Sequence, residues 1–357
     1  MNVEDICNKF YLTKKLSFEE FKFLYCLEDF SSLNAFARKL ALKNFSNKIY
    51  IRGLIEISTI CKNNCYYCGL RSDNKNTQRI RLKKEDILKR AEAGYKMGIR
   101  TLVMQGGEDP FYTKDYMVDI IKTLKNIYPD IAITLSLGER PFEDFKAFKE
   151  AGADRYLLRH ETYDRGHYQA LHPREMSFDN RIECLYNLKS LGFQTGCGMM
   201  IGSPYQKIEN VYKDLELILK LKPQMVGLGP FIAQKDSPFN NYENGKLSYV
   251  LKILSIVRIA DEKVLLPATT ALGTIHKMGR ELGILAGANV LMPNIGSEKL
   301  RQSYKLYDNK IGTKLENEDD FFSLSSKVGA IGYELSMSRG DYWQERLKSD
   351  LERRNYV

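Results

Sequence analysis

The sequence predicts an α/β protein built as a (βα)8 barrel of the TIM type, with an N-terminal helical segment and a C-terminal helical extension. Three observations support this fold. Short apolar or β-branched runs alternate with longer amphipathic stretches, eight such runs can be counted, and 357 residues suit one barrel of this kind. We expect the helical segment over residues 1–48, the barrel over 49–300, and the extension that closes the barrel over 301–357.

Eight segments are predicted to be strands, because each is a short run rich in β-branched or other apolar residues. The stretches between them have the helical period, as where Ile87, Leu88, Ala91 and Tyr95 share one face. The predicted strands cover residues 49–58, 100–107, 131–138, 154–161, 194–202, 225–232, 264–273 and 289–296.

The strand faces predict an unusually polar barrel interior. In the third predicted strand Ile and Leu alternate with small or polar residues, so the apolar set should meet the helices. In the fourth, Arg155, Arg159 and Glu161 share one parity, as do Arg52 and Glu56 in the first. Polar inward positions near the C-terminal strand ends indicate a cavity for a polar ligand. A structural ion pair remains the alternative for each single charge.

Composition and charge weigh against two classes of partner. The net charge is +9, but the lysines are spread among acidic residues and no nucleic-acid motif is present, so polynucleotide binding is not expected. A small anionic substrate fits the charge equally well. No apolar run approaches the roughly 20 residues that a membrane helix needs, and residues 1–15 lack a signal core. We therefore expect a cytoplasmic protein without a membrane partner.

Three cysteines occur at Cys-x3-Cys-x2-Cys spacing directly after the first predicted strand: Cys61, Cys65 and Cys68 in CKNNCYYC. An odd total of seven cysteines argues against a disulfide framework. Structural zinc sites have four ligands, and no second pair follows downstream. A 4Fe-4S cluster on three thiolates would leave one iron open to a ligand, which is the chemistry this spacing favours. The remaining cysteines are interpreted as small buried hydrophobes: Cys7, Cys26, Cys184 and Cys197.

The Cys-x3-Cys-x-aromatic-Cys pattern resembles the signature of the radical S-adenosylmethionine (SAM) enzymes. In that family the open iron is chelated by the amino and carboxylate groups of SAM. An electron from the reduced cluster then cleaves SAM to methionine and a 5'-deoxyadenosyl radical. The resemblance implies an enzyme with two cofactors, a 4Fe-4S cluster on Cys61, Cys65 and Cys68, and SAM.

The segment QGGED at the end of the second predicted strand matches the GGE motif of the same family. The motif implies that Gly106 and Gly107 allow close backbone approach and that Glu108 meets the SAM ammonium group. A carboxylate suits ribose hydroxyls or an ammonium group, and a guanidinium suits a carboxylate. By motif, the further SAM contacts are Tyr67 near the adenine, Ser136, Glu161, Arg181, and Met199 in the fifth strand, whose neighbouring glycines let the nucleoside lie close.

Within the radical SAM enzymes, several segments resemble the HydE family of FeFe-hydrogenase maturases. They include RGLIEIS with CKNNCYYCGLR, QGGEDP, ADRYLLRHET, PATTALGT and ANVLMPN. This resemblance implies a role in building the hydrogenase H-cluster on an iron-cysteine carbonyl cyanide precursor. The implied partners are other hydrogenase maturases and a low-potential electron donor. Four residues would line the substrate end of the barrel: Arg159, Thr269, Thr270 and Tyr304.

Two other functions stay open at this stage. A radical SAM enzyme similar to biotin synthase or methylornithine synthase would act on an organic substrate, although sulfur insertion is disfavoured because few cysteines lie outside the loop. A non-catalytic iron-sulfur scaffold would need neither the GGE motif nor Glu161 and Arg181. One departure concerns several HydE relatives, which carry a second cysteine cluster after the eighth strand. Residues 306–329 of this chain contain no cysteine, so no second iron-sulfur cluster is expected.

Overall fold

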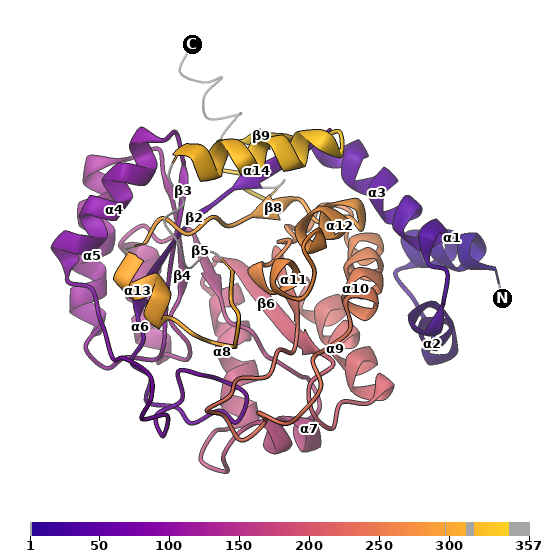
Figure 1. Cartoon of the computed structure of the whole chain (residues 1–357), viewed down its shortest axis with the longest axis horizontal. Helices are drawn as coiled ribbons and strands as arrows, with labels where there is room; N and C mark the ends of the chain where they lie inside the picture. Colours follow the sequence, from indigo (N-terminus) through magenta and orange to yellow (C-terminus); the bar gives the residue numbers. More distant parts are fainter. Residues whose placement is uncertain (1, 297, 312–317, 343–357) are drawn as a thin grey trace.

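The barrel wall is formed mainly by a parallel sheet in which each strand pairs with the next one along the chain (Figure 1). The computed structural model describes residues 2–296, 298–311 and 318–342. The six strands of this sheet are β2 (Gly53–Ser58), β3 (Thr101–Gly106), β4 (Ala132–Ser136), β5 (Arg155–Leu157), β6 (Gln194–Ile201) and β7 (Met225–Pro230).

The ring closes through β1 (Lys48–Ile51), which pairs in parallel with β8 (Val290–Leu291). Isolated parallel bridges join Met225 to Leu265, Pro267 to Val290, and Leu54 to Asn294. All eight predicted wall segments therefore take their places, and the barrel prediction is confirmed. The prediction of a full strand over 264–273 was wrong, because proline cannot donate to the ladder and the chain turns into a helix from Thr270 onward.

Helices surround the outer face of the wall. Ile131, Ile133, Leu135 and Leu137 all belong to the main hydrophobic core between strands and helices, which confirms the predicted outward face. Side-chain caps begin several helices; Thr113, for example, accepts from the backbone of Tyr116. The surrounding helices are α4 (Lys84–Lys96), α5 (Lys114–Ile127), α6 (Phe142–Glu150), α7 (Arg165–Leu171), α8 (Phe178–Ser190), α9 (Ile208–Leu221), α10 (Leu247–Ala260), α11 (Thr270–Ile275) and α12 (Gly279–Leu285).

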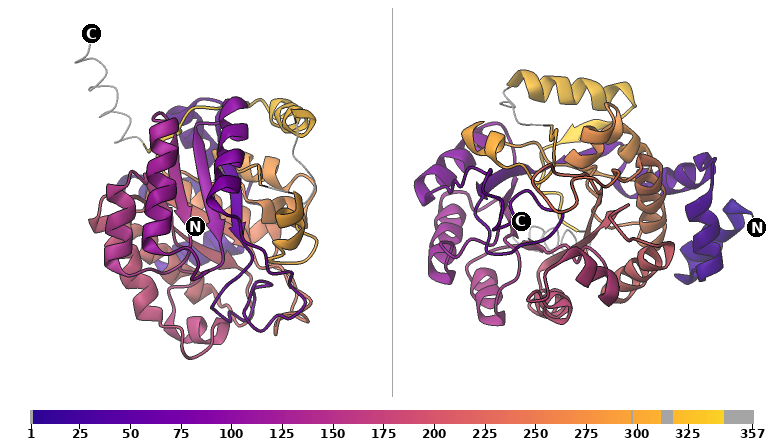
Figure 2. Two further views of the ribbon diagram at one scale, coloured as in Figure 1. Left: turned by 90° about the vertical axis from the view of Figure 1, so that its left-hand side faces the viewer. Right: turned by 60° about the horizontal axis from the view of Figure 1, so that its bottom comes forward.

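Three N-terminal helices lie on one side of the barrel, outside the ring (Figure 2). They are α1 (Val3–Thr13), α2 (Phe18–Cys26) and α3 (Ser31–Phe45), and α3 packs along α10. The buried Lys252 of α10 donates to the carbonyl of Leu27 at 3.0 Å, and Ser255 donates to Asn34 at 2.8 Å. No helix in the described part of the chain is both long and apolar enough to cross a bilayer.

The C-terminal extension contains α13 (Glu298–Ser303), α14 (Glu318–Ala330) and β9 (Glu334–Ser336). Strand β9 pairs in parallel with β1, an element that the sequence pattern did not predict, and α14 packs against β9 (Figure 1). Residues 312–317, within the segment that lacks cysteine, lie outside the described residues.

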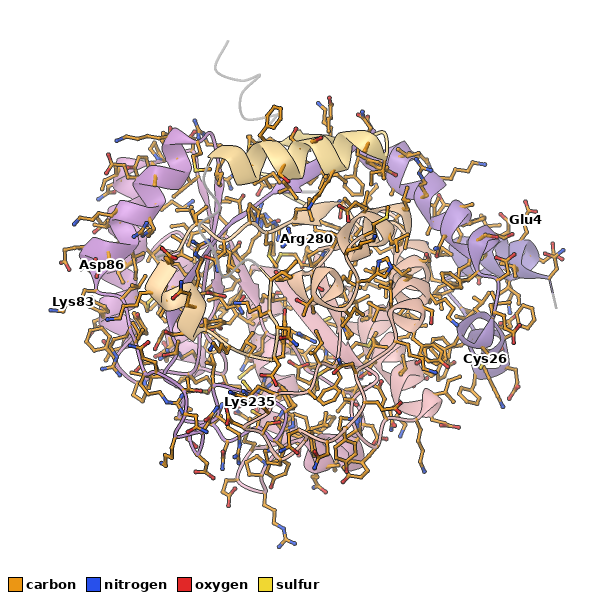
Figure 3. The ribbon with its side chains drawn as sticks, viewed as in Figure 1. Glu4, Cys26, Lys83, Asp86, Lys235 and Arg280 are labelled. Carbon is orange, nitrogen blue, oxygen red and sulfur yellow. The ribbon has the colours of Figure 1, made fainter. Side chains whose placement is uncertain are left out.

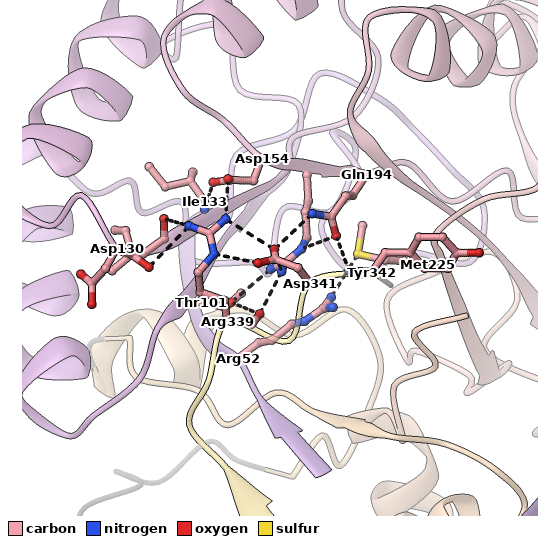
Figure 4. Close-up of polar contacts among 12 residues, drawn as sticks. Arg52, Thr101, Asp130, Ile133, Asp154, Gln194, Met225, Arg339, Asp341 and Tyr342 are labelled. Atoms are coloured by element: carbon pink, nitrogen blue, oxygen red, sulfur yellow. Dashed lines mark hydrogen bonds and ion pairs between the residues drawn. The ribbon is translucent and has the colours of Figure 1, made fainter. Parts of the chain in front are cut away.

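A buried ion-pair network fills the barrel at the N-terminal ends of its strands (Figure 4). Arg155, which begins β5, lies 2.6 Å from Asp341 of the extension and donates to Thr101 at 3.1 Å. Arg339 binds Asp341 and Asp154, each at 2.8 Å. For Arg155 the alternative of a structural ion pair is therefore correct. Its place is opposite the end of the barrel where parallel strands carry their sites.

We predict that Asp341→Ala lowers the free energy of unfolding by about 3–5 kcal/mol, because it leaves the buried Arg155 without its carboxylate. Burial favours the neutral acid, but Arg155 and Arg339 outweigh it and hold the pKa of Asp341 below its ordinary value. A lowered carboxyl pKa stabilises the fold above pH of about 4, and this contribution is lost as the pH falls further. Urea unfolding at several pH values measures both effects.

The matched control is Asp179→Ala, which removes the exposed partner of Arg165. It should leave the free energy of unfolding nearly unchanged, because exposed ion pairs contribute little. Equal losses in the two variants would contradict a special role for the network around Asp341.

Candidate active site

The cysteine loop connects β2 to α4 and is organised by Arg79. The guanidinium of Arg79 donates to the carbonyls of Thr59 and Leu70 at 2.8 Å and to that of Arg71 at 2.6 Å. Arg81 forms a two-pronged ion pair with the buried Asp109. Arg79 and Arg81 thus stabilise the loop, a role that the sequence does not reveal because contacts to loop carbonyls leave no residue pattern.

The three loop cysteines are all partly buried, and they are near enough for each to influence the charge of another. Cys61 accepts from the backbone N–H of Glu108 at 3.3 Å, and Cys68 accepts from that of Leu70 at 3.4 Å. Burial, followed by the charge of neighbouring thiols, raises the pKa of Cys65 well above its ordinary value and that of Cys68 to about 12. The backbone N–H donors favour the thiolate form, which is the form that binds metal.

The four other cysteines belong to regular elements outside this loop, namely α1, α2, α8 and β6. Cys7, Cys184 and Cys197 are buried, as predicted, but the prediction was wrong for Cys26. Cys26 is exposed outside the barrel (Figure 3), because it is the last residue of α2 and the described residues do not bury its side chain. Among the described residues no set of three or more His, Cys, Asp or Glu side chains is arranged to hold a metal ion. An iron-sulfur cluster needs a different arrangement, because its thiolates bind separate irons and not one shared ion.

The end of β3 approaches the cysteine loop with backbone against backbone. Gly107 donates to Ser58 at 3.1 Å, and Lys62 donates to the carbonyl of Glu108 at 3.0 Å. A Cβ on Gly107 would lie 2.3 Å from the carbonyl oxygen of Ile60 and 2.7 Å from Cβ of Cys61. Only glycine fits this position.

Glu108 lies buried at the mouth of the barrel in a niche made by the next strand. Its Oε1 accepts from the backbone N–H of Glu139 at 3.0 Å, and its Oε2 lies 3.3 Å from Nζ of Lys62. Gly138 has φ of +75°, and a Cβ there would lie 2.1 Å from Glu108. Ser136, at the end of β4, is paired in register with Gln105 and is partly buried near this mouth.

The segment after β5 brings Arg159 and Glu161 together. Nη2 of Arg159 lies 3.1 Å from Oε2 of Glu161 and donates to the carbonyl of Met199 at 2.8 Å. Nη1 of Arg181 donates to the carbonyl of Arg159 at 3.0 Å, and its Nε pairs with Glu139. Oε2 of Glu161 and Nε of Arg159 are buried without a hydrogen-bond partner among the described residues.

Two predicted SAM contacts have orientations that the sequence did not indicate. The side chain of Met199 packs into the main hydrophobic core, so only its backbone faces the site. Tyr67 is partly buried, and its hydroxyl lies 3.2 Å from Nε2 of His172. Both residues belong to the walls of the site, and neither has a free polar group aimed into it.

The four residues predicted to line the substrate end of the barrel do not all contact one another. Tyr304 is buried, accepts from Gln105 at 3.3 Å, and lies under Nζ of Lys310, which also pairs with Glu56. Thr269 donates to the carbonyl of Leu228 at 3.2 Å, and Thr270 begins α11. No described hydrogen bond joins either threonine to Arg159.

Two contributors near the site were missed by the sequence analysis. Tyr307 is one: burial raises its pKa to about 12, and Glu56 and Arg159 are close enough to influence it. Asp214 is the other: it is fully buried on α9 and lies 3.3 Å from Nε2 of His160. The sequence did hold one indication of this role for Asp214. Its carboxylate lies on the otherwise apolar face of α9 that carries Val211, Leu215 and Ile218.

Comparisons with known proteins agree with this geometry. A model of the radical SAM superfamily matches residues 55–218, from β2 into α9. The [FeFe] hydrogenase maturase subunit HydE of Thermotoga maritima is 45% identical over 275 residues, which cover 77% of this chain and 78% of that protein. The 3-methylornithine synthase of Methanosarcina acetivorans is 29% identical over 310 residues, covering 86% of each chain.

Solved structures show the same fold. The structure of the methylornithine synthase PylB superimposes with a TM-score of 0.81 and 25% identity, covering 93% of this chain and 97% of that one. The hydrogenase maturase HydG superimposes with a TM-score of 0.77 and 24% identity, covering 94% of this chain and 76% of that one.

The chain belongs to the radical SAM superfamily, and it is an enzyme of that class. Membership implies a 4Fe-4S cluster and SAM as cofactors. Within the superfamily the chain is a homologue of the hydrogenase maturase HydE, as the sequence motifs predicted.

We predict that Gly107→Ala prevents stable cluster binding, because the added methyl group forces the end of β3 away from Cys61. The free energy of unfolding should fall by about 1–3 kcal/mol, as in other overpacked sites. Iron content after anaerobic reconstitution and thermal unfolding measure the two effects. Gly329→Ala is the control, since a Cβ there has no atom within 4 Å. Full iron content in Gly107→Ala would contradict the inferred coupling.

Proposed function

We propose that this chain cleaves SAM reductively at a 4Fe-4S cluster held by Cys61, Cys65 and Cys68, and that it acts in assembly of the FeFe-hydrogenase H-cluster. The observation that carries the proposal is the placement of the three-cysteine loop against the end of β3, where the backbone N–H of Glu108 reaches the sulfur of Cys61, at the C-terminal end of a barrel whose interior is polar. The 45% identity to HydE supports the maturation role.

The residues present fit the two cofactors. Thiolates are the ligands that iron-sulfur clusters prefer, and backbone N–H groups point at two of the three sulfur atoms. Nε of Arg159 and Oε2 of Glu161, which make no hydrogen bond among the described residues, offer polar contacts to a ligand inside the barrel. When bound, the cluster supplies one electron to SAM, which yields methionine and a 5'-deoxyadenosyl radical.

The chain's own residues bind and orient SAM. Glu108 is held by the N–H of Glu139, which leaves its carboxylate able to accept from the SAM ammonium group. Arg181 uses Nε for Glu139 and Nη1 for a carbonyl, so Nη2 is the nitrogen for the methionine carboxylate. Gly106 and Gly107 bring the backbone close, and the remaining contacts come from Tyr67, Ser136, Glu161 and the backbone of Met199.

We assign the substrate end to Arg159, Thr269, Thr270 and Tyr304. A guanidinium and hydroxyl donors suit an anionic ligand, and an iron-cysteine carbonyl cyanide precursor has that character. The proposed partners are the other hydrogenase maturases and a low-potential electron donor. We propose a single cluster, because the sequence has no cysteine after Cys197.

A second candidate function is a radical rearrangement of an organic substrate. It is favoured by the similarity to 3-methylornithine synthase, which extends over 86% of both chains. Formation of 3-methylornithine from amino acids by the reduced protein with SAM would establish this second function and displace the first.

We predict that Cys65→Ser abolishes SAM cleavage, because a hydroxyl is a poor ligand for an iron-sulfur cluster. The measurements are 5'-deoxyadenosine formed by the anaerobically reduced protein, and activation of FeFe hydrogenase in a mixture of the maturases in which this chain replaces HydE. The control Cys184→Ser changes a buried thiol outside the loop and should retain both activities. Retained SAM cleavage in Cys65→Ser would refute the cluster assignment.

We predict that Arg181→Ala weakens SAM binding by roughly 1.5–3 kcal/mol, the range for a hydrogen bond to a charged group. Equilibrium dialysis with the oxidised, cluster-loaded protein measures SAM affinity without turnover. Arg165→Ala, on the exposed surface of α7, should leave SAM affinity unchanged. Unchanged affinity in Arg181→Ala would remove this residue from the site.

A further inference from the structure

Two buried side chains, those of Asp214 and His160, contact each other beside the site. Asp214 belongs to α9, and His160 lies between Arg159 and Glu161 in the segment after β5. Both side chains are fully buried. Oδ1 of Asp214 lies 3.3 Å from Nε2 of His160, and it also accepts from the backbone N–H of Tyr163. The proposed chemistry uses neither residue.

His160 links this carboxylate to the neighbouring strand. Its Nδ1 accepts from the backbone N–H of Gly198 in β6 at 3.3 Å. Because Nδ1 accepts, the ring proton resides on Nε2, which faces Asp214. The imidazole therefore connects α9 to β6 across the segment after β5.

Glu161 lies between the two anchored points, His160 and Tyr163, and it has an unusual backbone. Its φ is +65°, in the left-handed region that non-glycine residues avoid. Its N–H donates to the carbonyl of Gly198 at 3.0 Å, and its carbonyl accepts from the N–H of Met200 at 3.3 Å. Such strained conformations persist only where the surroundings over-determine them.

We propose that Asp214 and His160 are positioning residues that hold Glu161 in its left-handed conformation, so that the side chains of Glu161 and Arg159 face the SAM site. The pair anchors the segment on both sides of Glu161, and the ion pair between Arg159 and Glu161 forms on the opposite face. The inference rests on the proposed contact between Glu161 and SAM, and it adds the device that maintains that contact.

Asp214→Asn removes the negative charge at nearly constant volume, so the contacts of Oδ1 with the N–H of Tyr163 and with Nε2 of His160 lose their charge-assisted strength. It should weaken SAM binding to the oxidised, cluster-loaded protein about tenfold, the lower range for loss of a group that orients a ligand-binding residue. Amide hydrogen exchange in peptides spanning residues 159–163 should accelerate, since one backbone anchor, at Tyr163, and one side-chain contact, at His160, are weakened. His160→Gln, which loses the acceptor for Gly198, should act in the same direction.

The control is Asp154→Asn, at the other end of the same strand. Asp154 is a partly buried carboxylate that pairs with Lys125 and Arg339 and has no described contact with the Glu161 segment. This variant should lose stability without changing SAM affinity or hydrogen exchange in residues 159–163. Equal losses of SAM affinity in Asp154→Asn and Asp214→Asn would refute the positioning role.

A double-mutant cycle separates positioning from general destabilisation. If Asp214 acts through Glu161, Asp214→Asn should weaken SAM binding no more than about twofold further when Glu161 is already alanine. A full additional tenfold loss would overturn the inference. If Glu161→Ala alone leaves SAM affinity unchanged, the proposed contact of Glu161 is wrong, which is distinguishable from a failure of Asp214 to act.

Discussion

The site depends on one constraint, the backbone contact between Gly107 and the start of the cysteine loop. Two consecutive βα units meet there, and any side chain on Gly107 would collide with the carbonyl of Ile60. The contact places the N–H of Glu108 on the sulfur of Cys61 and the carboxylate of Glu108 at the barrel mouth. The proposed cluster ligand Cys61 and the proposed SAM contact Glu108 are therefore positioned by the same few atoms of main chain.

The two ends of the barrel use charge in opposite ways. At the N-terminal end Arg155 is paired with Asp341, and the network joins residues that lie far apart in sequence (Figure 4). At the C-terminal end Arg159 and Glu161 pair with each other but keep buried atoms without a hydrogen-bond partner among the described residues. Unmet hydrogen-bonding capacity in a buried place is costly, and at the C-terminal end the proposed ligand would meet it. At the N-terminal end Arg52 also has two buried nitrogens without a hydrogen-bond partner among the described residues, so such atoms alone do not separate the two ends.

The sequence predicted the barrel because strand alternation and helical period are local patterns. Ile133 and Leu135 face the helices as their alternation requires. The turn of residues 270–275 into α11 could not be predicted from the β-rich run before it, since contacts across the closing ring decide the matter. In the site, the cysteine loop and Glu108 lie together as their motifs imply. The outward side chain of Met199 and the anchoring by Asp214 and Arg79 depend on packing between distant segments, which no spacing reveals.

The central claim is that three thiolates hold a cluster with one iron left for SAM. Electron paramagnetic resonance of the reduced, reconstituted protein tests it most directly, because the spectrum of the cluster reports the ligands of its irons. The account predicts a 4Fe-4S signal whose g-values shift when SAM is added under conditions in which SAM is not cleaved. A cluster signal that stays unchanged at saturating SAM, or a protein that binds zinc and forms no cluster, would contradict it.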